Sequence, residues 1–353
     1  MGSEMCIRDR GSRYGAPMTT RWGVLGPGRI AKSFARDLRL VPGAELTAVG
    51  SRSHARATAF AQELGFSAAY GSYEELLADE SVDAVYVASP HALHVEHVTA
   101  ALEAGKHVLC EKPITLRAAD AEQLFALALR RELLLMEAMW TACHPVVRAV
   151  QHDVREGAFG TPRHLHAEIG FVVDLPPEDR LLDPELGAGA LLDMGIYPLT
   201  VAHLFLGEAE ELTATASLSG SGIDLDIAIA GRYPGGALAT MTASMTSWSA
   251  HRAELGTDQG RLVMEDFFHP KVATFTPIAT GGTNDFVEHE EPRRIEGREP
   301  VLGRGMAHEA VEFQRCLAEG LLESPLVPHA QTLTIMRQMD DLRAQVGVRY
   351  AGD

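Results

Sequence analysis

Cysteine is scarce in this sequence of 353 residues, and its distribution argues against two common roles. The four cysteines, Cys6, Cys110, Cys143 and Cys316, are widely scattered, and no Cys-x-x-Cys pair occurs. This spacing is not typical of a structural zinc site, and it does not predict a disulfide framework. We therefore expect a protein of a reducing compartment, the cytoplasm.

Basic charge and long apolar runs are also lacking. Lys and Arg number 31 against 48 Asp and Glu, which gives a net charge of −17. This acidity argues against nonspecific nucleic-acid binding, whereas a helix N-terminus and a few arginines can still hold an anionic cofactor. Apolar runs such as residues 133–136 are too short to cross a bilayer, and the first residues lack the apolar stretch of a secretory signal. We expect neither a nucleic-acid nor a membrane partner.

The length and composition predict a globular protein of two domains. Apolar residues make up 46% of the chain and charged residues 22%, which is usual for such proteins. Residues 1–17 differ from the rest, because they are rich in Arg, Gly and Ser, show no apolar period and precede a start-like Met18. We expect this tail to be non-native or a misassigned start, and to be disordered.

Strand-like and helix-like segments alternate through residues 18–140. Short apolar or β-branched runs are separated by segments with helical spacing. This pattern is typical of βαβ units with right-handed crossovers, and it predicts a Rossmann domain, a doubly wound parallel sheet. The expected strands are residues 21–25, 45–49, 82–87, 107–109 and 133–136, and the expected helices are residues 29–40, 53–64, 72–77, 91–104 and 116–131.

Strand-like runs separated by turn signals dominate the next part of the chain. They predict that residues 141–353 form an α+β domain with a large, mostly antiparallel open sheet. The expected strands are residues 163–174, 212–217, 224–233, 237–246 and 261–264, the expected helices are residues 191–206, 306–321 and 331–346, and residues 278–300 are expected to be a loop.

A glycine-rich turn links the first expected strand to the first expected helix. Glycines in this position let the backbone approach a pyrophosphate and leave N–H groups directed at it. An ordinary strand-to-helix turn has a similar sequence, but the flanking β-α-β pattern favours a dinucleotide site. The expected cofactor residues are Gly26, Pro27, Gly28, Arg29 and Ile30, with Ala31 in the position of the third glycine.

The end of the second expected strand indicates which dinucleotide binds. An acidic residue there would bind the ribose 2′-hydroxyl and repel a 2′-phosphate. This chain has Ser51, Arg52 and Ser53 instead, so a guanidinium and two hydroxyls can meet a phosphate. We expect NADP in preference to NAD; the alternative is that Arg52 is a solvated surface residue.

Ser89 and Pro90 follow the next long strand-like run, at the sheet edge where ligands bind in this fold class. We expect both to contact the nicotinamide side of the cofactor. His91, His94 and His97 come next at intervals of three. Residues so spaced drift around a helix, and no Cys or acidic ligand is paired with them. We therefore predict capping or packing roles for these histidines, and no metal site.

Lys112 follows the expected strand 107–109, within the tripeptide Glu111-Lys112-Pro113. Pro113 restricts the backbone of Lys112 and directs its side chain into the cleft, and the bond between them is a candidate for the cis form. A lysine beside the nicotinamide can bind the substrate oxygen and stabilise negative charge on it. We expect both Glu111 and Lys112 to lie beside the cofactor.

Asp193 and Tyr197 stand four residues apart, so one helical face carries both. The positive charges of Lys112 and of an oxidised nicotinamide would lower the pKa of the Tyr197 phenol toward neutrality. Tyr197 is then a candidate acid/base, and Asp193 would orient the substrate or Lys112. A helix-capping aspartate and a core tyrosine would show the same spacing, so the spacing leaves that alternative open.

Taken together, these motifs resemble the Gfo/Idh/MocA oxidoreductases. The resemblance covers residues 20–348 and rests on the glycine turn, the Glu-Lys-Pro tripeptide and the glycine-rich segment that leads to Tyr197, where many members have histidine. Residues 70–76, 108–113 and 136–141 look most similar to the branch of dimeric dihydrodiol dehydrogenases and NADP-dependent D-xylose 1-dehydrogenases.

That branch implies NADP, oxidation of a trans-dihydrodiol or of a pyranose C1 hydroxyl, and a homodimer formed through the open face of the second sheet. Lys112, Asp193 and Tyr197 would be the catalytic residues, and Trp140 and Phe171 would line the substrate site with them. Residues 142–144 are Ala, Cys and His where the branch usually has aromatic residues. We therefore expect a less aromatic pocket wall, which favours sugars or other polyols over aromatic diols.

The predicted function is hydride transfer between NADP and a secondary hydroxyl or carbonyl carbon of a sugar, polyol or trans-dihydrodiol. A keto-sugar reductase that uses the same residues is one alternative, and a nucleotide-sensing regulator without turnover is another. The loops expected to set specificity, residues 171–188 and 265–300, carry no motif that names the substrate.

Overall fold

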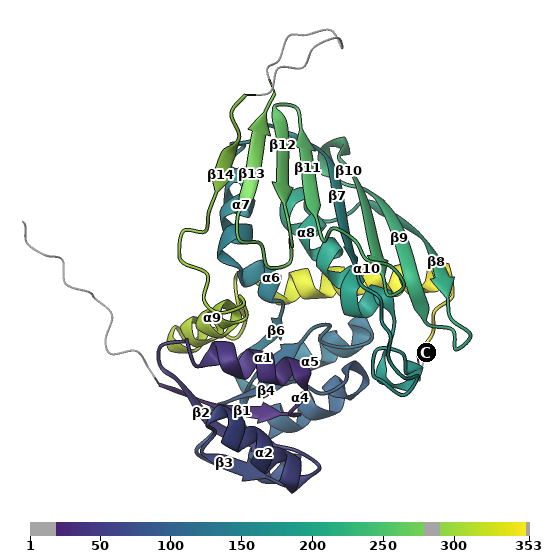
Figure 1. The fold of residues 1–353 in the computed structure, drawn as a ribbon. Coiled ribbons are helices and arrows are strands. Elements are labelled where there is room, and N and C mark those ends of the chain that lie inside the picture. Colours follow the sequence, from purple (N-terminus) through teal and green to yellow (C-terminus); the bar gives the residue numbers. More distant parts are fainter. Residues whose placement is uncertain (1–18, 279–289, 351–353) are drawn as a thin grey trace, which may run out of the picture.

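Six parallel strands form the first sheet of the computed structural model, which describes residues 19–278 and 290–350 (Figure 1). The strand order is β3-β2-β1-β4-β5-β6, and every neighbouring pair is parallel. The order reverses between β1 and β4, and ligands of doubly wound sheets bind at that reversal. The Rossmann prediction is confirmed. The strands are β1 Thr20–Leu25, β2 Ala44–Gly50, β3 Ala68–Tyr70, β4 Ala84–Val87, β5 His107–Glu111 and β6 Leu135–Ala138.

The helices of this domain begin and end close to the predicted positions. Ser53 and Ser72 are N-caps, each accepting a backbone N–H in the first turn of its helix, and Gly65 ends α2 in the left-handed conformation. The predicted helix 91–104 begins with a 3₁₀ turn, His91–Leu93. The helices are α1 Arg29–Leu38, α2 His54–Leu64, α3 Tyr73–Leu77, α4 His94–Glu103 and α5 Ala118–Arg131.

The second sheet has eight strands in the order β14-β13-β12-β11-β7-β10-β9-β8. All its pairs are antiparallel except β7 with β10, as the prediction of a mostly antiparallel sheet requires. Buried and exposed residues alternate along β9 and β10, because helices cover one face and leave the other open (Figure 1). The strands are β7 Pro162–Gly170, β8 Glu211–Leu218, β9 Asp224–Arg232, β10 Leu238–Ser244, β11 Ala253–Thr257, β12 Gly260–Met264, β13 Ala273–Pro277 and β14 Arg293–Ile295.

Several elements of this part differ from the prediction: the helix α6 Trp140–Cys143 was not predicted, and β7 ends at Gly170 although a strand was expected to residue 174. β14 lies within residues 278–300, so the prediction of a loop there was wrong for residues 293–295; this edge strand is exposed and too short to show alternation. Strands β11 and β13 were not predicted. The helix α7 Pro145–Arg155 was also missed, because proline at its first position was interpreted as a boundary although proline is favoured there.

The two C-terminal helices, α9 Ala307–Ala318 and α10 His329–Val346, pack back against the Rossmann domain. Phe313 of α9 lies 5.0 Å from Trp22 of β1, measured between ring centroids. Asp37 of α1 accepts backbone N–H bonds from Met306 and Ala307 at the start of α9. Residues after 141 therefore contribute to the packing of the first domain.

One helical segment, Pro184–Leu206, is long and apolar enough to cross a membrane by length and composition alone. However, 83% of its most apolar window is buried within the protein. It includes a π-helical turn, Leu191–Gly195, and the core helix α8 Ile196–Leu206, which packs on β7 and β10. Burial of this kind is typical of a core helix. The predicted tail, residues 1–17, lies outside the described residues.

Candidate active site

A groove of about 700 Å³ runs along the carboxyl edge of the first sheet at the strand reversal. Gly26 has a φ of +90°, and a Cβ there would lie 3.2 Å from the Ala88 carbonyl oxygen, so the turn needs glycine. Gly28 precedes α1, and a Cβ at Gly28 would meet nothing within 4 Å. The turn therefore leaves space at a helix N-terminus, as a pyrophosphate requires. The predicted residues Pro27, Arg29, Ile30, Ser51, Arg52, Ser89 and Pro90 line the same groove.

The far end of the groove carries positive charge. Ser51, Arg52 and Ser53 line it just after β2, and Arg56 of α2 joins them. Among the described residues 51–73, those that line the groove include two arginines and no carboxylate. Sequence reasoning missed Arg56, although it stands one helical turn after Arg52.

A smaller cavity of about 220 Å³ adjoins the inner end of the groove. Four residues line both spaces: Ile30, Ala88, Ser89 and Arg180. A cofactor in the groove would therefore reach the cavity wall. The remaining lining residues are His91, Glu111, Lys112, Ile169, Phe171, Asp193, Met194, Tyr197 and Phe268.

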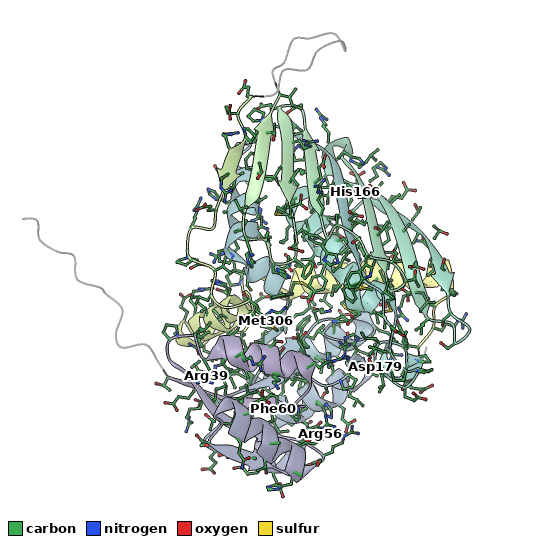
Figure 2. All side chains as sticks on the ribbon, viewed as in Figure 1. Arg39, Arg56, Phe60, His166, Asp179 and Met306 are labelled. Carbon is green, nitrogen blue, oxygen red and sulfur yellow. The ribbon has the colours of Figure 1, made fainter. Side chains whose placement is uncertain are left out.

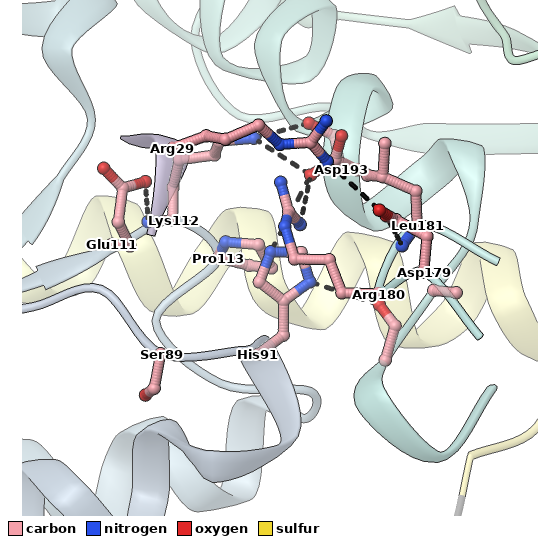
Figure 3. Close-up of polar contacts among 12 residues, drawn as sticks. Arg29, Ser89, His91, Glu111, Lys112, Pro113, Asp179, Arg180, Leu181 and Asp193 are labelled. Carbon is pink, nitrogen blue, oxygen red and sulfur yellow. Dashed lines mark hydrogen bonds and ion pairs between the residues drawn. The ribbon is translucent and has the colours of Figure 1, made fainter. Parts of the chain in front are cut away.

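Lys112 enters this cavity from the end of β5, where its peptide bond to Pro113 is cis, as the sequence suggested (Figure 3). Its Nζ donates to the backbone oxygen of Asp193 at 2.5 Å and lies 4.7 Å from the centroid of the Tyr197 ring. Burial lowers the pKa of Lys112, but its electrostatic interactions with Tyr197, Asp193 and Glu111 outweigh this effect, and the pKa is raised overall. Lys112 is therefore a buried ammonium at neutral pH.

Asp193 lies in the π-helical turn, and three nitrogen atoms surround its Oδ1 within 3.8 Å. Arg180 Nη1 is 3.2 Å away, Lys112 Nζ 3.7 Å and His91 Nε2 3.8 Å. Burial would raise the pKa of Asp193, but Lys112, Arg180 and His91 together hold it below the usual range. Burial lowers the pKa of His91 to about 3, so His91 is neutral at physiological pH. The carboxylate is thus ionised and held mainly by two cations.

Asp224 of β9 stabilises the turn that carries Asp193 through a hydrogen bond to its backbone. Asp224 is fully buried, and its Oδ2 accepts the backbone N–H of Leu191 at 2.6 Å. Gly189 approaches the same carboxylate so closely that a Cβ at this position would collide with it. The glycine-rich sequence before Asp193 therefore permits this close approach.

Tyr197 of α8 is buried beside Lys112, and its hydroxyl accepts a hydrogen bond of 3.1 Å from Trp140 Nε1. Burial raises the pKa of Tyr197, and the opposing effects of Lys112 and Trp140 do not cancel that rise. Lys112 thus lowers the pKa of Tyr197, as predicted, but in the protein alone desolvation of the phenolate is the larger effect. The predicted net shift toward neutrality, which also depends on the charge of an oxidised nicotinamide, stays a prediction.

The other predicted residues occupy distinct positions. Glu111, like Lys112, lines the smaller cavity rather than the groove, and it accepts hydrogen bonds from the Tyr86 hydroxyl and the Lys112 backbone N–H. Phe171 lines the cavity as predicted. Trp140 lies behind Tyr197 and is not among the lining residues. The catalytic and binding roles of all these residues stay predictions.

Of the three histidines, His91 lines the cavity, whereas His94 and His97 pack within the first domain. The His94 ring lies between the backbone oxygens of Ser89 and Pro113, each 2.9 Å from a ring nitrogen, and its N–H can donate to one of them, so the ring packs between the segments that follow β4 and β5. His97 Nδ1 lies 2.8 Å from the Ser89 hydroxyl. Within the part of the chain that the structure describes, no group of three His, Cys, Asp or Glu could hold a metal ion.

Sequence reasoning missed Arg180 and Phe268 as residues of the site. Both lie in the loops expected to set specificity, and neither belongs to a motif or an apolar period. Phe268 supplies an aromatic ring 5.4 Å from the Tyr197 ring centroid. The expectation of a less aromatic pocket wall is therefore incomplete, because aromatic side chains come from Phe171 and Phe268 instead of residues 142–144.

Comparison with known proteins identifies the family. Residues 20–139 match the family described as "Oxidoreductase family, NAD-binding Rossmann fold", and residues 147–263 match the "GFO/IDH/MocA C-terminal domain". The chain belongs to the GFO/IDH/MocA oxidoreductase family. It is accordingly an NAD(P)-dependent oxidoreductase with a Rossmann cofactor domain.

Similar members of the family are named for two activities. Trans-1,2-dihydrobenzene-1,2-diol dehydrogenase of Mus musculus is 33% identical over 342 residues, covering 95% of this chain and 99% of the relative. The enzyme of that name from Homo sapiens is 31% identical over 341 residues, again 95% and 99% of the two chains. The structure of KijD10, a 3-ketoreductase from Actinomadura kijaniata with NADP and TDP-benzene, is 30% identical, with a TM-score of 0.80 over 93% of this chain and 98% of that one.

Proposed function

We propose that this member of the family transfers a hydride between NADP and a secondary hydroxyl or carbonyl carbon of a sugar, polyol or trans-dihydrodiol. The observation that carries the proposal is the position of the Lys112 ammonium. It lies 4.7 Å from the Tyr197 ring and 3.7 Å from the Asp193 carboxylate, in a cavity that adjoins the cofactor groove.

Different residues of the cavity serve proton transfer, charge stabilisation and positioning in the proposed reaction. The cofactor, when bound, supplies the carbon that accepts or donates the hydride. In the direction of oxidation, Tyr197 accepts the proton of the substrate hydroxyl, and Lys112 stabilises negative charge on the substrate oxygen. Asp193 holds the Lys112 side chain in place, and the apolar side chains of Phe171 and Phe268 keep water from the reacting atoms.

The substrate class follows from the two sides of the cavity. Lys112, Asp193 and Tyr197 present hydrogen-bonding groups, whereas Phe171 and Phe268 present aromatic rings to the same space. A ring-shaped molecule with vicinal hydroxyls fits both sides. A screen of aldoses, inositols, keto-sugars and dihydrodiols, followed by the absorbance of NADPH in both directions, tests this class; no turnover with any of them would reject it.

Reduction of a keto-sugar is the second candidate reaction. A 3-ketoreductase that shares the fold at 30% identity supports it. The same residues serve both directions, because Tyr197 would then donate the proton that it accepts in oxidation. Initial rates with NADPH and a keto-sugar, compared with NADP and the corresponding alcohol, separate the two candidates.

We predict that NADP is preferred over NAD because of Arg52 and Arg56. Hydrogen bonds to charged groups contribute about 1.5–3 kcal/mol. Arg52→Ala and Arg56→Ala should therefore each lower kcat/KM with NADP by about 10–100-fold and leave kcat/KM with NAD nearly unchanged. Arg39→Ala, an exposed arginine at the end of α1 that does not line the groove, is the matched control. Equal losses with both cofactors, or a wild-type preference for NAD, would contradict the prediction.

We further predict a homodimer formed through the open face of the second sheet. Figure 2 shows side chains such as His166 on this face, and Trp248 beside it is 74% exposed at a hollow of about 570 Å³ lined by β7, β8, β9 and β10. Trp248→Ser should weaken self-association by at least about 30-fold, as expected for a central aromatic residue. Light scattering after size exclusion measures this, with Leu129→Ser, an exposed leucine of α5, as the control. A Trp248→Ser protein that stays dimeric at low concentration would count against this interface.

A further inference from the structure

Two adjacent residues of the segment between β7 and the π-helical turn contact both parts of the site (Figure 3). Asp179 Oδ2 accepts a hydrogen bond of 3.2 Å from Nη2 of Arg29, the first residue of α1, directly after the glycine-rich turn. Arg180 Nη1 donates at 3.2 Å to Oδ1 of Asp193. Asp179 and Arg180 thus connect the first helix of the cofactor domain to the catalytic carboxylate.

Arg180 is the group that fixes the direction of the Asp193 carboxylate. Of the three nitrogen atoms around Oδ1 it is the closest, and it makes the hydrogen bond, whereas Lys112 donates its hydrogen bond to the backbone oxygen of Asp193. His91 is neutral and 3.8 Å away, so its attraction for the carboxylate is weak. Arg180 also lines the cofactor groove, so its side chain contacts both the groove and the cavity. A ligand bound in either space can therefore alter its position.

Asp179 holds the backbone of Arg180 in a tight turn. Its Oδ1 accepts the N–H of Leu181 at 3.1 Å, and its backbone oxygen accepts the N–H groups of Leu182 and Asp183 at 2.8 and 3.0 Å. The side chain of Asp179 is 22% exposed, whereas that of Arg29 is 72% exposed. A displacement of Asp179 by its partner Arg29 would therefore move Arg180 with it.

We propose that Asp179 and Arg180 form a clasp between the two parts of the site. In this clasp Arg180 is a positioning residue for Asp193, and the Arg29–Asp179 ion pair links the position of Arg180 to the cofactor turn. The inference rests on the proposed function, because it gives Asp193 its place beside Lys112. Ion pairs as exposed as Arg29–Asp179 contribute little to folding stability, so breaking this pair should alter catalysis and cofactor binding while the protein stays folded.

Replacement of Arg180 tests the positioning role. Misplacement of a catalytic group can lower the rate by about 100-fold, so Arg180→Gln should lower kcat by about 10–100-fold and change the Kd of NADP much less. Arg180→Lys should recover part of the kcat, because it restores the charge without the planar guanidinium. Asp174→Asn, an exposed acid of the same segment that lines neither cavity, is the control and should retain full activity. An unchanged kcat in Arg180→Gln, or a proportional loss of kcat and NADP affinity, would overturn the positioning role.

A double-mutant cycle on Arg29 and Asp179 tests the link to the cofactor turn. Each of Arg29→Gln and Asp179→Asn should lower kcat by up to about fivefold. The kcat of the double variant should be no lower than that of the less active single variant, because both substitutions remove the same ion pair. Effects that multiply would reject the clasp.

The same double-mutant cycle can be measured on the Kd of NADP by calorimetry, a readout that does not depend on catalytic turnover. If the wild-type protein turns over none of the screened substrates, the proposed function fails, but the calorimetric cycle still decides the clasp. Non-additive effects on NADP affinity would support the ion pair as a link to the cofactor turn, and additive effects would reject it.

Discussion

Replacing Tyr197 with phenylalanine is expected to lower kcat by about 10²–10⁴-fold, the usual contribution of a general acid or base. The substitution removes only the hydroxyl, so the ring keeps its packing against Phe268 and its position 4.7 Å from Lys112 Nζ. The affinity for NADP should therefore change little, because Tyr197 does not line the cofactor groove. Steady-state kinetics and calorimetry measure the two effects separately.

Tyr233→Phe is the matched control for this experiment. Tyr233 follows β9 in the same domain and is also buried, but it lines neither the groove nor the cavity. Its removal should leave kcat unchanged. A Tyr197→Phe protein with nearly normal turnover would show that the proton is transferred elsewhere, and it would remove Tyr197 from the proposed mechanism.

Replacing Lys112 with methionine is the second large effect, with an expected loss in kcat of about 10²–10³-fold. Met has a similar length but cannot donate to the substrate oxygen. The pH dependence should change as well. Oxidation needs the deprotonated phenol and therefore speeds up as the pH rises through the pKa of Tyr197. The Lys112 ammonium lowers that pKa, so its loss should move the rise to higher pH.

Lys106 offers a matched control, because it stands at the opposite end of the same strand. It is also buried, and its Nζ donates to the backbone oxygens of Asp79 and Val82 at 2.7 and 2.8 Å. Both Lys106→Met and Lys112→Met should lower the thermal midpoint, since each removes the partner of buried polar groups. Only Lys112→Met should lower kcat per folded molecule. Equal kinetic losses in the two variants would point to a general loss of structure instead.

Apart from β3, the order of elements in the first domain could be predicted from the sequence, because each of the other strands and helices of its sheet shows a local pattern. β4 is a fully buried apolar run, α2 and α3 begin at serine caps, and α2 ends at Gly65. The glycine turn, Lys112 and Tyr197 were recognisable for the same reason, since each depends on residues close in the chain. Short strands such as β3 and β14 were not, because neither has alternation that a local pattern could show.

Tertiary structure alone decided how the site is completed. Arg180 reaches Asp193 across a coil without any apolar period, and Phe268 arrives from a turn beyond β12. The pKa of Tyr197 depends on burial by residues from both domains, and so the net direction of its shift could not follow from the presence of Lys112 alone. The sequence by itself determined the fold class, the glycine-rich turn and the residue types of the proposed catalytic centre, because these depend on local patterns. The surroundings of these residues form only when distant segments pack together. These surroundings set the pKa values of the site and the shape of the cavity that would hold the substrate.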